Sequence, residues 1–135
     1  MLLQMVFEKL AKAALLRSGA VSVGYASSSH RAASQLVATL KRNRLALGLF
    51  GTPFTWDAVA QLVQELERVH PSLARAHGGP QLEYPWESPA GGVFWPERDL
   101  PVALRLGAST STIAIHALAF AKKLASHFDV IFPPA

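Results

Sequence analysis

The chain contains no cysteine, and this absence removes several kinds of site at once. Without thiols there is no disulfide framework, no thiolate zinc site and no cysteine nucleophile. The phosphate-binding patterns GxGxxG and GxxxxGK[ST] and the zinc-protease pattern HExxH are missing as well. No two of the five histidines are four residues apart, and the carboxylates Glu65 and Glu67 point to different sides of their predicted helix. We therefore predict no catalytic residues, no metal site and no cofactor.

Charge is the second scarce feature. Charged residues make up 16% of the 135 residues, and hydrophobic residues make up 50%. An average soluble domain has about 25% charged residues. A chain of this length forms one small domain, here residues 1–135, and small domains have a large surface to cover. The shortage predicts that part of the surface contacts another protein or a membrane; a weakly polar, Ala-rich surface is the alternative.

A long membrane-spanning run is also lacking. The longest uncharged run, residues 106–121, has 16 residues and includes His116. At about 1.5 Å per residue it spans roughly 24 Å, less than the ~30 Å hydrocarbon core of a bilayer. We therefore expect a buried core helix here, with His116 as a core histidine, and keep membrane contact near residues 106–121 as the alternative.

The charges that are present are unevenly distributed. Residues 1–56 carry a net charge of +6, residues 57–101 carry −4, and residues 102–135 carry +2. Residues 1–19 form an amphipathic, nearly acid-free segment, and a tract rich in serine follows it. This pattern is typical of organelle targeting segments, so we expect an uncleaved targeting-like helix and a mitochondrial protein. An ordinary first helix in a cytoplasmic protein is the alternative.

Apolar periodicity predicts a mostly α fold. Apolar residues recur at helical spacing in four segments, and we expect helices near residues 2–17, 30–43, 55–70 and 109–127. Short β-branched or continuous apolar runs leave an α/β fold as the alternative. Its strands would lie near residues 21–25, 45–50, 102–106 and 129–132.

The segment between the third and fourth predicted helices breaks this pattern. Residues 78–101 hold four glycines and five prolines, too many for a helix, together with Tyr84, Trp86, Phe94 and Trp95. Proline reduces the entropy that an extended segment loses on docking, and Trp and Tyr are favoured interface anchors. We therefore interpret residues 78–101 as an extended docking strap whose four aromatic rings fill pockets on this chain or on another subunit.

A serine-rich turn suggests a second kind of site. Ser27, Ser28, Ser29 and Arg31 lie between a strand-like run and a predicted helix, where hydroxyls and free N–H groups can hold an anion. The alternative hypothesis for function is therefore a small α/β enzyme or anion-binding domain that uses Ser27–Arg31. Simple capping of the next helix is the other interpretation of these serines.

Basic residues raise a third hypothesis, a nucleic-acid-contacting subunit of an organellar ribosome. The basic run 40–44 has no interleaved aromatic residues, and this argues against nucleic acid as the partner. The leading hypothesis is a non-catalytic accessory subunit of a larger complex, expected in mitochondria and near a membrane. Its partners would be other protein subunits in a hetero-oligomer.

Overall fold

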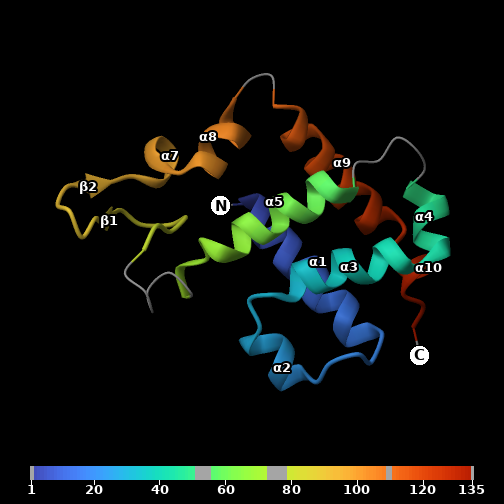
Figure 1. The fold of residues 1–135 in the computed structure, drawn as a ribbon. Coiled ribbons are helices and arrows are strands. Elements are labelled where there is room, and N and C mark those ends of the chain that lie inside the picture. Colours follow the sequence, from blue (N-terminus) through green and yellow to red (C-terminus); the bar gives the residue numbers. More distant parts are fainter. Residues whose placement is uncertain (1, 51–55, 73–78, 109–110, 135) are drawn as a thin grey trace.

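The computed structural model describes residues 2–50, 56–72, 79–108 and 111–134 and is mostly helical, as predicted (Figure 1). The four predicted helices are all present. They are α1 (Leu2–Arg17), α3 (Ala32–Arg42), α5 (Trp56–Arg68) and α9 (Thr112–Ser126). Residues 55, 109 and 110, at the predicted ends of the last two helices, lie outside the described residues.

Helices occupy the four segments in which the alternative α/β fold placed strands. These helices are α2 (Val23–Ser28), α4 (Arg44–Phe50), α8 (Pro101–Gly107) and α10 (Phe128–Ile131). Local caps favour helix at two of them. The Ser22 hydroxyl accepts from the Tyr25 N–H at the start of α2, and the Asn43 side-chain oxygen accepts from the Ala46 N–H in α4. The strand prediction is therefore wrong, because short apolar runs do not by themselves distinguish a strand from a helical turn.

A glycine two residues after α1 stops this helix. Gly19 has φ +67°, a left-handed conformation that other residues adopt only at a cost. The Gly19 N–H donates to the Leu16 carbonyl, and the Ala20 N–H donates to the Leu15 carbonyl, each at 3.1 Å. These two bonds form a Schellman motif that stops the helix and turns the chain toward α2.

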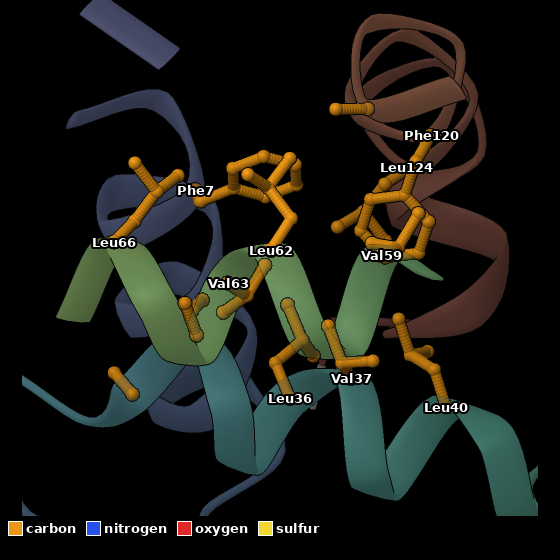
Figure 2. Close-up of a cluster of buried hydrophobic side chains, with 14 of the residues drawn as sticks. Phe7, Leu36, Val37, Leu40, Val59, Leu62, Val63, Leu66, Phe120 and Leu124 are labelled. Atoms are coloured by element: carbon orange, nitrogen blue, oxygen red, sulfur yellow. The ribbon is translucent and has the colours of Figure 1, made fainter. Parts of the chain in front are cut away.

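The core lies where α1 and α5 each pack against both α3 and α9 (Figure 2). Phe120 of α9 is fully buried, and its ring lies within 6 Å of three other aromatic rings. The centroid distances are 5.8 Å to Phe7, 5.1 Å to Phe50 and 5.9 Å to Trp56. This cluster joins α1, α4, α5 and α9 into one core.

α3 and α5 are also linked by polar side chains at both ends. The Glu67 carboxylate, in the last turn of α5, accepts hydrogen bonds from the backbone N–H of Ser34 at 2.9 Å and from its hydroxyl. At the opposite end, Lys41 pairs with Asp57 in the first turn of α5. Because residue 34 faces residue 67 and residue 41 faces residue 57, the two helices run antiparallel.

The strap has more regular structure than the sequence predicts. β1 (Trp86–Glu87) and β2 (Val93–Phe94) form an antiparallel hairpin in which Trp86 lies opposite Phe94. Gly91 and Gly92 have φ of +88° and +98°, which allows the tight return between the strands. The short helix α7 (Pro96–Asp99) follows, and Leu82 and Leu100 on either side of this region are buried in the core. Residue 78 lies outside the described residues.

Candidate functional site

The main candidate site is an apolar surface on α1 and α9. In the described part of α1, the exposed residues are Met5, Val6, Lys9, Ala13 and Leu16. Lys9 is the only charged residue among them. On α9, Ile115 is 65% exposed and Leu118 is 51% exposed, and the next turn adds exposed Ala119. We call Met5, Val6, Ala13, Leu16, Ile115, Leu118 and Ala119 the outer apolar face.

The outer apolar face is hollowed where the helices meet. α1 packs against α9, and α8 packs against α9. A groove between these three helices is lined by Leu3, Val6, Leu106, Ala114, Leu118 and Ala121. Val6 also lines a second hollow on α1 with Met5, Lys9 and Leu10, so the two depressions adjoin. Side chains that fit such hollows are apolar.

Two lysines adjoin this face. Lys9 lies between Val6 and Ala13 on α1, and Lys122 is exposed one turn beyond Leu118 on α9. The sequence has no acidic residue between Asp99 and Asp129, so α8 and α9 carry no negative side chain. A surface that contacts this face would therefore match it best with apolar groups at the centre and negative groups at the edge.

The four aromatic residues of the strap divide into two pairs. Trp86 and Phe94 stack on each other with ring centroids 5.8 Å apart, are partly buried, and Trp86 also packs against the core. Tyr84 and Trp95 are 51% and 44% exposed. The predicted interface residues therefore include an internal pair, Trp86 with Phe94, and an outward pair, Tyr84 with Trp95.

The predicted anion-binding residues lie around α2 and the start of α3. The Ser27 and Ser28 hydroxyls donate to carbonyls of their own helix, at 2.8 Å and 3.1 Å from the Gly24 oxygen. The Ser29 hydroxyl accepts from the Arg31 N–H at 3.4 Å, and the Arg31 side chain is exposed. These serines therefore satisfy local backbone groups.

The N-terminus of α3 already holds an anion from this chain. The Glu67 carboxylate accepts from the Ser34 backbone N–H and hydroxyl, and the Ala33 N–H also contributes. Burial raises the pKa of Glu67, while the hydrogen bonds from Ser34 and Ala33 and the charge of Arg31 act in the opposite direction. Glu67 therefore provides from α5 the cap that the Arg31 side chain does not provide at the N-cap position.

A cluster of Glu8, His30 and His70 is a further site, which the sequence patterns did not reveal. One ligand atom of each residue lies within 4.8 Å of the other two, and all three residues are partly buried. The two imidazole rings stack with centroids 4.1 Å apart. These residues are separated by 22 and 40 positions in the sequence, so no local spacing could have shown them together.

Charges in this cluster affect one another. Burial alone would raise the pKa of Glu8. The hydrogen bond and charge of Lys12, and then the two imidazoles, lower it by more, so the pKa of Glu8 is below its ordinary value. Burial lowers the pKa of His70, His30 lowers it further, and the carboxylates of Glu8 and Glu83 act against both. The cluster therefore favours an ionised Glu8 beside a neutral His70.

Within the described residues, no single helix is long and apolar enough to cross a membrane. α8 and α9 together reach the required length and hydropathy, but the two are bent by 82° relative to each other. Residues 106–121, for which the sequence leaves membrane contact as an alternative, therefore belong to parts of both helices, with residues 109 and 110 outside the described part of the chain. No protein-family model, curated protein or solved structure matches this chain.

Proposed function

We propose that this chain is a non-catalytic accessory subunit that binds a partner protein through the outer apolar face. The observation that carries the proposal is the exposure of large apolar residues on two packed helices, α1 and α9, where only lysines interrupt the face. Single exposed apolar residues are ordinary on a protein surface, whereas a continuous patch marks an interaction site. The low overall charge of the chain supports the same proposal.

The free energy that a partner would gain by covering the outer apolar face is too small for a stable complex, so the interface has to be larger than this face. Full burial of one large aliphatic side chain contributes about 1.5–3 kcal/mol, and half-exposed side chains contribute about half of that. Met5, Val6, Ile115 and Leu118 are between 42% and 65% exposed, so together they supply roughly 4 kcal/mol. A micromolar complex needs about 8 kcal/mol after the costs of association.

Further contacts are therefore part of the proposal. Tyr84 and Trp95 of the strap are exposed and belong to the residue types that most often anchor interfaces. In the proposed complex they add a second point of contact with protein subunits. The proposed setting is a mitochondrial assembly near a membrane, supported by the basic, amphipathic segment 1–19 and by the lysines that border the outer apolar face.

Native electrophoresis of cell extracts tests this proposal. The full chain, carrying an affinity tag, is produced in its own cells, and the assembly that contains it is sized and isolated. The test variant combines Val6→Glu and Leu118→Glu, two partly exposed positions of the outer apolar face. The matched control combines Gln61→Glu and Gln64→Glu, which add the same charge to the exposed polar side of α5.

We expect the wild type and the control to migrate in an assembly larger than the monomer. The Val6→Glu, Leu118→Glu variant should migrate as a monomer, because each carboxylate would have to leave water and enter the apolar contact. Circular dichroism and a thermal melt show whether this variant keeps its fold. A wild type that migrates as a monomer, or a folded face variant that stays in the assembly, rejects the proposal.

A further inference from the structure

We propose that Glu8, His30 and His70 bind a divalent transition-metal ion, for which zinc is the best match. Two imidazoles and one carboxylate are a ligand set that zinc and related ions use in proteins, and hard cations such as Mg²⁺ prefer oxygen ligands alone. The residues come from three segments that are far apart in the sequence: α1, the connection between α2 and α3, and the chain just after α5. The fold alone brings them together.

The distances allow the three donors to reach one ion. Donor atoms bound to zinc at about 2.0–2.2 Å in a tetrahedron lie roughly 3.3–3.5 Å from one another. In this structure the three donors lie within 4.8 Å of each other. Side-chain rotations that move the donor atoms by about an ångström bring them to the spacing that zinc requires. The stacked rings of His30 and His70 have to turn so that one nitrogen of each points to the ion.

An unsatisfied nitrogen at this position supports the assignment. Among the described residues, Nδ1 of His30 is one of two buried side-chain nitrogen or oxygen atoms that have no hydrogen-bond partner. Buried polar groups are almost always paired, and an ion or a water molecule is the usual explanation where the protein provides no partner.

The neighbours of Glu8 hold its carboxylate in place. Lys12 Nζ lies 2.6 Å from Oε1, whereas Gln4 Nε2 lies 3.3 Å and His70 Nε2 lies 3.5 Å from Oε2. Gln4 is itself buried. Oε1 is therefore occupied by Lys12, whereas Oε2 accepts from Gln4, lies beside His70 and is the oxygen that would bind the ion. Outer contacts of this kind orient metal ligands in proteins.

Two features make the site weaker than a structural zinc site. The Lys12 ammonium repels a cation bound at the other oxygen of Glu8. The Ser72 N–H donates to Nδ1 of His70 at 3.1 Å, so the ring proton lies on Nε2 while no metal is bound. Metal binding at Nε2 requires that proton to move to Nδ1, and the bond from Ser72 is then lost. We therefore expect micromolar affinity, with a fourth coordination position left for water or for a donor from a partner.

Titration calorimetry with ZnCl₂ on the full chain tests this proposal. We expect one zinc per chain and a zinc-dependent rise in the melting temperature, because the ion links three segments of the folded state only. His30→Ala and Glu8→Gln should each weaken zinc binding by roughly tenfold or more. The matched controls are His116→Ala and His127→Ala on α9 and at its end, and they should leave the affinity unchanged.

A second variant keeps the result decisive if one of these substitutions harms the fold. Lys12→Met leaves all three ligands and removes both the competing charge and one contact that orients Glu8. The loss of the charge is the larger effect, so zinc binding should tighten by up to about tenfold. X-ray absorption should show two imidazole nitrogens and one carboxylate oxygen at about 2.0–2.2 Å from zinc. No binding at millimolar zinc, or equal losses in the His127→Ala control and in the His30→Ala variant, overturns the proposal.

Discussion

α5 and α1 pack against the same core but present opposite kinds of surface to the outside. The exposed residues of α5 are Asp57, Gln61, Gln64 and Arg68. The exposed residues of α1 with described side chains are Met5, Val6, Lys9, Ala13 and Leu16. Both helices bury an apolar stripe, so core formation requires only one apolar side of each. The second apolar side of α1 therefore has no role in the core that the structure describes.

The same difference extends to the partners of these helices. α3 and α5 are linked by polar side chains at both ends, Ser34 with Glu67 and Lys41 with Asp57. α1 and α9 meet through apolar side chains, among them Phe7 and Phe120, and the groove beside their contact is apolar too. The outer side of α5 is therefore polar, whereas the outer side of α1 and α9 is largely apolar, as the proposed contact with a partner requires.

The largest expected effect separates the two sides of one helix, α9. Leu124 is fully buried, whereas Leu118 is 51% exposed on the outer apolar face. Leu124→Ala should lower the free energy of unfolding by about 2–5 kcal/mol, because it leaves a cavity in the core. Leu118→Ala should cost only about 1 kcal/mol or less in the isolated chain, because about half of this side chain is already in water. Urea unfolding of the two variants measures both values, and similar losses would show that Leu118 belongs to the core.

The next effect concerns the cap that α5 provides to α3. Glu67→Ala removes the acceptor of the Ser34 N–H and hydroxyl, so it should cost about 1–2 kcal/mol of unfolding free energy. Glu67→Gln keeps a carbonyl oxygen at the same place and should cost less. Urea unfolding at neutral pH compares the two variants. Equal losses would mean that the negative charge, rather than the acceptor, stabilises the α3–α5 pair.

Glu67 should also make the stability of the fold depend on pH, with a smaller effect whose direction follows from its pKa. Burial raises the pKa of Glu67 in the folded chain, so between the ordinary glutamate pKa of about 4.3 and the raised pKa the folded state holds more protons than the unfolded state. This contribution to stability is present below about pH 4.3 and is lost as the pH rises through the raised pKa. The unfolding free energy of the wild type, minus that of Glu67→Gln, should therefore fall between pH 4 and pH 7. A difference that rises over this range would contradict the raised pKa.

The sequence was sufficient to predict the long helices. In α5 the apolar residues Val59, Leu62, Val63 and Leu66 recur at helical spacing, and all four are buried. The sequence also carried the cue for the hairpin, because Gly91 and Gly92 separate two short runs that contain aromatic residues. The five prolines nearby obscured that cue, since proline usually excludes a strand.

The sites were harder to predict because they depend on tertiary contacts. The shortage of charge indicated an apolar surface, but its location depends on which side of α1 and α9 the core covers. The sequence suggested that Ser27–Ser29 cap α3. Instead, Glu67 accepts the hydrogen bond from the Ser34 N–H in the first turn of α3, from a position 33 residues further along the chain. Glu8, His30 and His70 come together through the packing of α1 with the ends of α3 and α5, and no sequence pattern records such long-range proximity.

The smallest expected effect is at the other end of the α3–α5 pair, where Lys41 meets Asp57. Their side chains are 49% and 89% exposed, so water and salt screen the pair. A double-mutant cycle with Lys41→Ala and Asp57→Ala should give a coupling free energy of about 0.2–0.5 kcal/mol, which decreases as salt is added. Asp57 also lies in the first turn of α5, so Asp57→Ala alone should cost more than Lys41→Ala because of the helix dipole. A coupling above about 1 kcal/mol would mean that the polar link at this end contributes as much as the Glu67 cap does at the other. The two ends of the pair would then be equally stabilised, although only the Glu67 end is partly buried.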